Sequence, residues 1–314
     1  MLQNMNLILK KGDKYIEHNY MIELVYSLLV LCDYDILSPY NEEYKFEIKS
    51  TLGEKISKED HEFFCKKCKQ SFRFVIPCIF ALSLTLSGDK LIMSDKDKIK
   101  PYYFERIGGR AAIDLFVNHL NSYALATNFS KFYLSHIDMY KEYMLAYRDL
   151  IYTVMNDVIK LYGSIGTRFT AYVSQLVHPG GFGVSVSPEH AKCVIGGIFK
   201  DTTLDTALMS NVYFHEFSHH FVDRVVDENW NKMDKVIKGL DIKDIYLQKE
   251  YISETLIRAI SNYYCYQKEL AVNKHDFIEY PYSKKLYELL IDENVTEIND
   301  KTYKMLFSSL TPVL

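Results

Sequence analysis

The sequence has few of the features that place a chain in a specialised class. Its 314 residues include six cysteines, most of them in apolar stretches where a free thiol behaves as a small hydrophobe. This sparse usage excludes a disulfide framework. The 37 basic and 41 acidic residues are interspersed along the chain, so no basic face is set aside for DNA or RNA. We therefore expect a globular protein with no nucleic-acid partner.

The beginning of the sequence offers no segment that could cross a membrane. The apolar run MIELVYSLLVLC has about half the length of a membrane span and contains Glu23, which is typical of a buried helix. No small-residue cleavage site follows this run, so we expect no signal peptide. These features favour a cytoplasmic protein, unless a leader has been removed.

The sequence contains a single CxxC pair, Cys65 and Cys68, which supplies too few ligands to predict a zinc site. A structural zinc site needs a second pair of ligands at matched spacing, and none follows nearby in the sequence. We interpret the two cysteines as residues of an amphipathic helix, with a metal or redox role as the alternative.

The periodicity of apolar residues predicts an α+β fold that is mostly helical with a small β-sheet. A long amphipathic pattern over 135–163 ends at Gly163, a glycine placed as a helix stop should be. Three short segments rich in β-branched and aromatic residues follow within 167–199 and predict strands. We divide the chain into a helical N-terminal region, 1–105, and a catalytic region, 106–314, with a soft boundary that also allows one compact unit.

The strongest motif is NVYFHEFSHHFVDRVV, which follows those strands and has helical periodicity. Residues four apart share a face of a helix, so His215 and His219 can bind one metal ion while Glu216 lies beside them. This HExxH arrangement holds zinc through neutral imidazoles, and zinc lowers the pKa of water from about 15.7 toward about 7, so that a glutamate can take its proton. The alternative is a hydrogen-bonded histidine cluster in an ordinary core helix.

A catalytic zinc needs a third protein ligand, for which Glu254 is our candidate. No histidine stands six residues after His219, because that position is Val225. Glu254 lies 35 residues after His219 in a helical pattern, where it could instead pair with Arg258 at i, i+4 spacing. Three acids in a more polar neighbourhood are weaker candidates: Glu250, Asp241 and Asp244.

Other residues near these motifs have less specific signals. Arg258 is our catalytic candidate for holding a developing oxyanion or a substrate carboxylate, with a supporting role behind Glu254 or a purely structural one as the alternatives. Three tyrosines that follow it are either further candidates or packing residues: Tyr263, Tyr264 and Tyr266. His220 cannot share the metal with His215, so it either packs in the core or contacts substrate. Asp223 either supports a histidine ligand or pairs on the helix surface.

The segment KCVIGGIF, residues 192–199, is our candidate for an edge strand against which an extended substrate pairs. Gly196 and Gly197 would allow the substrate backbone to approach closely, and a bend in an ordinary strand is the alternative. The loop HPGGFG at 178–183 has two possible interpretations, a plain hairpin turn or a mobile rim of the site.

The motif HEFSHHF, with a helix-borne downstream glutamate in SETLIRAI, resembles the gluzincin branch of the zincin metallopeptidases. The whole chain is similar to a bacterial family of predicted gluzincins that have a helical N-terminal region. The resemblance implies a zincin-like catalytic region in which His215, His219 and Glu254 hold one Zn2+ and Glu216 is the general base. In one departure, Arg258 stands where many gluzincins have an acid, which leaves the histidine ligands without an assigned supporting partner.

These signals predict a zinc-dependent hydrolase, a metallopeptidase that acts on a peptide or protein substrate through water activated by Glu216. An alternative is a non-catalytic interaction or regulatory protein that retains the zincin fold. A metal-free α+β domain with a coincidental motif is a third possibility.

Overall fold

The computed structural model describes residues 5–310 except 89, 95–104, 186, 198, 201–202 and 233–241. Its main sheet is mixed and has the strand order β1-β2-β5-β7-β6. The five strands are Leu7–Lys11 (β1), Lys14–His18 (β2), Arg168–Val173 (β5), Phe182–Gly183 (β6) and His190–Ile195 (β7). β2, β5 and β7 run parallel, and β1 and β6 pair antiparallel at the two ends. Two short hairpins complete the strands: Leu84–Ser87 (β3) with Lys90–Met93 (β4), and Phe199–Lys200 (β8) with Thr203–Leu204 (β9).

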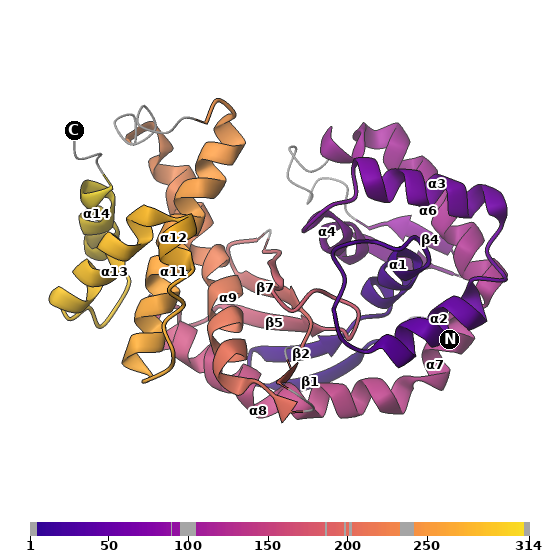
Figure 1. The fold of residues 1–314 in the computed structure, drawn as a ribbon, viewed down its shortest axis with the longest axis horizontal. Coiled ribbons are helices and arrows are strands. Elements are labelled where there is room, and N and C mark those ends of the chain that lie inside the picture. Colours follow the sequence, from indigo (N-terminus) through magenta and orange to yellow (C-terminus); the bar gives the residue numbers. More distant parts are fainter. Residues whose placement is uncertain are drawn as a thin grey trace.

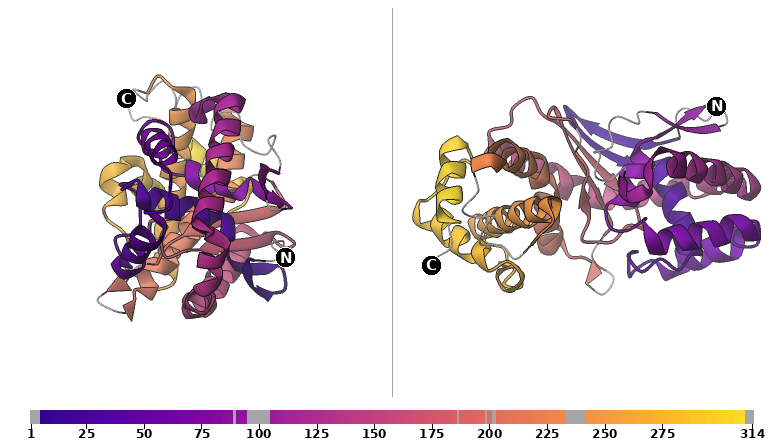
Figure 2. Two further views of the ribbon diagram at one scale, coloured as in Figure 1. Left: turned by 90° about the vertical axis from the view of Figure 1, so that its right-hand side faces the viewer. Right: turned by 90° about the horizontal axis from the view of Figure 1, so that it is seen from above.

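Helices cover both faces of the main sheet, as Figure 1 shows. The N-terminal helices are Tyr20–Leu31 (α1), Glu42–Leu52 (α2), Lys58–Gln70 (α3), Ile76–Leu82 (α4), Gly109–Thr127 (α6) and Phe129–Ser135 (α7). The remaining helices are Ile137–Tyr162 (α8), Thr206–Asn229 (α9), Trp230–Lys232 (η3), Ile245–Gln267 (α11), Asp276–Glu279 (α12), Pro281–Asp292 (α13) and Asp300–Ser309 (α14). The view from above in Figure 2 shows the sheet between these two groups.

The alternation of side chains along the strands produces two hydrophobic cores, one on each face of the sheet. Phe169 and Ala171 of β5 belong to the core formed with α8, α9 and α11. Tyr172, the next residue of the strand, belongs to the core formed with the N-terminal helices. Both cores pack on the same sheet, which therefore fixes the position of α9 and α11 relative to the N-terminal helices.

The structure confirms the coarse prediction of an α+β fold with a small sheet. α8 ends at the expected residue, because Gly163 adopts the left-handed conformation that glycine tolerates best. All residues of α1 are buried, as expected for the run MIELVYSLLVLC. None of the helices in the described parts of the chain has the length and apolar character needed to cross a membrane.

The strands of the N-terminal region were not predicted. β1 and β2 form a hairpin around Gly12 and Asp13, and β2 pairs with β5, so residues 7–18 belong to the main sheet. A signal was present, because two strand-like segments separated by a Gly-Asp dipeptide are typical of a β-hairpin. The helical description of residues 1–105 therefore needs to include this hairpin and the one formed by β3 and β4.

Candidate metal centre

α9 carries the histidine motif on a helix that is anchored at its start and along one face. The Asp205 side chain caps the helix by accepting a hydrogen bond from the Leu208 N–H at 2.9 Å. Phe214 and Phe217 are fully buried in the core beneath the sheet. His215 and His219 lie one turn apart, and their side chains keep 15% and 19% of their surface exposed. Packing thus holds the helix while the two imidazoles stay accessible.

α11 brings Glu254 to the same place. Asp244, a weaker ligand candidate, instead caps this helix by accepting from the Tyr246 and Leu247 N–H groups. Leu256, Ile257 and Ile260 are buried in the core shared with α9. This packing turns Glu254 toward α9, where its side chain is 16% exposed.

The ligand atoms of these three residues converge. The His215 Nε2 lies 3.5 Å from Glu254 Oε2, and the His219 Nε2 lies 3.3 Å from Glu254 Oε1. All three ligand atoms fall within 4.8 Å of one another. In a tetrahedral zinc site with metal–ligand distances of about 2.0–2.2 Å, neighbouring nitrogen and oxygen ligands are about 3.4 Å apart. The separations in this protein therefore fit a zinc ion held by two imidazoles and one carboxylate.

Glu216 lies beside the three ligand atoms rather than among them. Its carboxylate oxygens are 4.0 Å from the Nε2 atoms of both His215 and His219, and its side chain is 8% exposed. The Gly183 backbone, in strand β6, hydrogen-bonds to this carboxylate. A Cβ at Gly183 would lie 2.7 Å from the His219 Cβ, so only glycine allows β6 to approach the helix this closely.

The pKa values of the site follow from burial and from the mutual positions of the charged groups. Burial raises the pKa of Glu216, against the lowering effect of the two histidines. Burial alone would also raise the pKa of Glu254, but His215 and His219 hold that pKa well below its usual range. Glu254 is therefore an ionised carboxylate, the form that binds a cation, whereas Glu216 has more tendency to accept a proton.

Asp223 supports one of the histidines. Its Oδ1 atom lies 3.3 Å from the Nδ1 atom of His219, on the side of the ring opposite the convergent Nε2 atom. Burial would lower the pKa of His219, but Asp223 and Glu254 raise it well above its usual value. A carboxylate at Nδ1 fixes the orientation of a histidine ligand, so the supporting role expected as one alternative for Asp223 matches its position.

Arg258 contacts the Glu254 carboxylate, and whether it also contacts a substrate stays a prediction. Its Nε donates to Glu254 Oε2 at 3.1 Å, and its Nη1 donates to the buried Asp276. The guanidinium also lies over the Tyr280 ring, 4.5 Å from the centroid. Through its Nε and Nη1 atoms, Arg258 links Glu254 to Asp276.

The sequence did not point to Asp276, because the end of α11 and a loop separate this residue from Glu254. Asn262 Nδ2 donates to Asp276 Oδ2 at 2.9 Å, and the Asn273 N–H donates to Asn262 Oδ1 at 2.7 Å. α12 is thereby fastened to α11 behind the glutamate. The only sequence signal for this pairing was an arginine followed, later in the chain, by an acidic residue on a helix. Many arginines and acids in the sequence share that pattern.

Most of the other candidates have structural roles. Tyr264 stacks on Phe214 with ring centroids 4.1 Å apart, and the Tyr263 hydroxyl donates to the Val295 carbonyl. Tyr266 packs near Tyr263 and Tyr287. Glu250 is exposed on α11 and does not belong to the converging group, and Asp241 lies outside the described residues.

The edge strand was assigned to the wrong segment. β7 lies between β5 and β6, so residues 192–195 are inside the sheet, and the terminal strand is β6 from the loop HPGGFG. The close backbone approach at Gly196 is to the chain itself, because a Cβ there would lie 1.9 Å from the Val177 carbonyl oxygen. The tight glycine that faces the candidate metal centre is instead Gly183.

A cavity of about 250 Å³ adjoins the cluster between α9 and the chain that follows β6. His219 and Asp223 line it on the helix side, and Val184 and Ser185 line it on the other. Ile79 of α4 closes part of it, so the N-terminal region contributes to its wall. His220 also lines this cavity while its ring packs edge-on against Phe221.

The fold and the cluster together define an α+β protein in which two helices present two histidines and a glutamate beside an edge strand. The chain belongs to the family described as "Domain of unknown function (DUF4932)", whose model matches residues 41–304. The match includes α9 and α11, and therefore all of the converging residues. No curated protein and no solved structure matches the chain.

Proposed function

We propose that this protein is a zinc-dependent metallopeptidase of the gluzincin type, with a zincin-like catalytic region built from the main sheet, α9 and α11. The observation that carries the proposal is the convergence of the His215 and His219 Nε2 atoms on the Glu254 carboxylate, at 3.5 and 3.3 Å. Structural histidines can satisfy their nitrogens with many partners, whereas three ligand atoms aimed at one point are typical of a metal site.

The residues around this point have the positions that hydrolysis requires. A bound zinc ion would supply Lewis acidity and lower the pKa of water. Glu216, with both of its oxygens 4.0 Å from a histidine Nε2, would accept the proton of the attacking water and later deliver it to the leaving amine. The burial that raises the pKa of Glu216 favours this exchange.

The neighbouring strand suits a peptide substrate. β6 is the terminal strand of the main sheet, and its Gly183 lies against the turn of α9 that carries Glu216 and His219. A terminal strand can form main-chain hydrogen bonds with an extended peptide and so present a peptide carbonyl to the site. This feature favours a peptide over a small ester or sugar as substrate.

The test is the Glu216→Gln variant, which keeps the shape of the side chain but removes its basicity. We expect the zinc content to stay at the wild-type value, while peptide turnover falls about 10²–10⁴-fold, the usual contribution of a general base. The measurement is cleavage of a peptide library followed by mass spectrometry, with metal content determined on the same preparations. Glu288→Gln, an exposed change on α13, is the matched control and should behave as wild type.

Two results would contradict the proposal. One is turnover by Glu216→Gln at the wild-type rate. The other is a zinc-loaded wild-type protein that cleaves no member of the library, which would favour a non-catalytic role for the same fold.

A further inference from the structure

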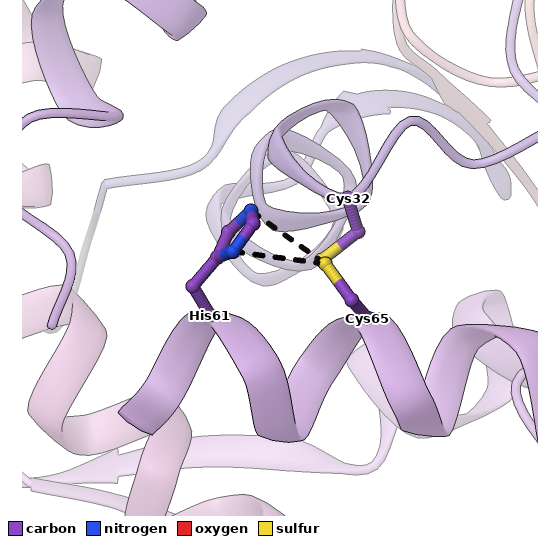
Figure 3. A group of neighbouring side chains, drawn as sticks. All are labelled: Cys32, His61 and Cys65. Atoms are coloured by element: carbon purple, nitrogen blue, oxygen red, sulfur yellow. Dashed lines mark hydrogen bonds between the residues drawn. The ribbon is translucent and has the colours of Figure 1, made fainter. Parts of the chain in front are cut away.

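A second group of metal-binding side chains lies in the N-terminal region, where the end of α1 meets α3. Cys32 is the C-cap residue of α1, and His61 and Cys65 project from α3 toward it, as Figure 3 shows. Each of the three offers one ligand atom, and these atoms lie within 4.8 Å of one another. The cysteines are free thiols, Cys32 buried and Cys65 half-buried.

Another cysteine, Cys68, lies on the same face of α3 as His61 and Cys65. His61, Cys65 and Cys68 follow one another at intervals of four and three residues, so they share one face of the helix. Cys68 is buried, and the Cys32 thiol hydrogen-bonds to both Cys68 and Cys65. Cys32 therefore contacts both members of the CxxC pair from a different helix.

The distances within the group resemble those of a zinc site with sulfur and nitrogen ligands. Cys65 Sγ lies 3.5 Å from His61 Nε2 and 4.0 Å from His61 Nδ1. With Zn–S near 2.3 Å and Zn–N near 2.0–2.1 Å, tetrahedral geometry separates sulfur from nitrogen by about 3.6 Å. The His61 Nε2 also lies 3.0 Å from the Leu31 carbonyl oxygen, a common partner for the non-ligating nitrogen of a histidine, so Nδ1 is the nitrogen left to bind the metal.

We propose that Cys32, His61 and Cys65 form a Zn2+ site that joins α1 to α3. Cys68 contacts the Cys32 thiol but lies outside the group of ligand atoms that are within 4.8 Å of one another. Thiolate and imidazole ligands select zinc over magnesium and calcium. The CxxC pair is incomplete when the sequence is searched downstream, but the structure brings Cys32 and His61 from upstream to Cys65. This inference shares no residue with the cluster on α9 and α11, so it stands or falls independently of the proposed peptidase activity.

An ion at this place would fasten α3 to the end of α1. α1 is buried along its whole length in the N-terminal core, whereas α3 buries only one side, at Asp60, Phe64 and Cys68. A bond between these helices would therefore hold the more exposed helix on the buried one.

The test uses cobalt, because it distinguishes thiolate ligands from the oxygen and nitrogen ligands of the other cluster. Reduced, metal-free full-length protein is titrated with Co2+ without oxygen. We expect the intense near-ultraviolet charge-transfer absorption of thiolate-bound cobalt, and in a parallel titration one equivalent of Zn2+ should abolish it. His219→Ala should keep this absorption, because it removes a ligand of the other cluster only.

Variants locate the signal. Cys32→Ser, Cys65→Ser and His61→Ala should each lose or strongly weaken the charge-transfer absorption, and circular dichroism checks that they are folded. Cys78→Ser is the control, since Cys78 is a buried cysteine of the same region whose thiol contacts the Tyr26 hydroxyl. The proposal is overturned if the reduced wild-type protein shows no charge-transfer absorption. It is also overturned if the absorption persists in both Cys32→Ser and Cys65→Ser.

Discussion

Two of the histidine–glutamate clusters in the described parts of the chain differ in their relation to solvent. In the first, His18 and Glu23 are 0% exposed, and the His18 Nε2 lies 3.2 Å from Glu23 Oε2. In the second, His215, His219 and Glu254 keep 15–19% of their side-chain surface exposed and adjoin a cavity through His219. The same residue types thus form a closed group in one place and an open group in the other.

Their hydrogen bonds differ in the same way. The Glu23 carboxylate accepts from the Tyr44 hydroxyl at 2.7 Å and from the Ser174 hydroxyl at 2.9 Å, so it joins α1 to α2 and to the residue that follows β5. The His18 ring also stacks on Tyr140, with centroids 3.9 Å apart. In the open cluster two imidazoles aim at one carboxylate. Histidine and glutamate side by side are therefore not enough to propose a functional site. Our proposal rests on ligand atoms that converge and remain accessible.

The largest effect on stability is expected from breaking the closed cluster. Glu23→Ala leaves a buried histidine without its charged partner, which costs about 3–5 kcal/mol of unfolding free energy. Urea unfolding monitored by circular dichroism measures this loss. Glu288→Ala, an exposed change, should cost less than about 0.5 kcal/mol. A loss for Glu23→Ala no greater than that of the control would show that the closed cluster is not a structural junction.

Acid should weaken the same junction. Burial would raise the pKa of Glu23, but His18 and the hydrogen bonds from Tyr44 and Ser174 lower it below the usual value of a glutamate. A lowered pKa in the folded state stabilises the protein above the unfolded-state pKa, and this contribution is lost as the pH falls through the folded-state value. We therefore expect wild-type stability to fall more steeply than that of Glu23→Gln below about pH 4.5. Unfolding curves at a series of pH values compare the two slopes, and parallel slopes would contradict this account.

In the open cluster, a smaller effect is expected from the residue behind the ligand. Arg258→Met removes the hydrogen bond to Glu254, so we expect zinc affinity to fall about 10–100-fold, as for other supporting residues of metal sites. Competition with a chelator measures the affinity. Arg148→Met, which removes an arginine paired with its exposed neighbour Asp149, should leave it unchanged. Equal affinities for the Arg258 variant and the control would show that Glu254 needs no support.

The smallest effects are expected at the helix caps, which are alike in the two regions. Asn19 caps α1 beside the closed cluster, and Asp205 caps α9 below the open one. Each change to alanine should cost about 1 kcal/mol of unfolding free energy, measured in urea. Neither should alter zinc content, because the helices are also held by their cores. Loss of zinc in Asp205→Ala would show that the cap, and not packing, orients the histidines.

Local patterns predicted the helix that carries the metal motif better than they predicted its surroundings. The cap at Asp205, the HExxH spacing and the glycine stop after α8 depend on residues close in sequence, so the sequence reveals them. The choice of Glu254 rested on its helical, partly apolar context, and the structure brings it to the two histidines.

Pairings between distant segments could not be predicted in this way. β2 pairs with β5 and makes the N-terminal hairpin part of the main sheet, and the short β6 replaces residues 192–199 as the terminal strand. The contact between Arg258 and Asp276 joins α11 to a later helix and has no local signal. Cys65 of the CxxC pair looked isolated because Cys32 and His61, which lie beside it, come earlier in the chain. In each case the missing information is which elements pack together.

The most direct test of the central claim is a crystal structure of the zinc-loaded protein with anomalous data collected at the zinc absorption edge. The account predicts an anomalous peak about 2.0–2.2 Å from His215 Nε2, His219 Nε2 and a Glu254 oxygen, with Glu216 outside the ligand set. A zinc-loaded crystal with no peak there, and with Glu254 still hydrogen-bonded to the two imidazoles, would contradict it and make the open cluster a second structural junction.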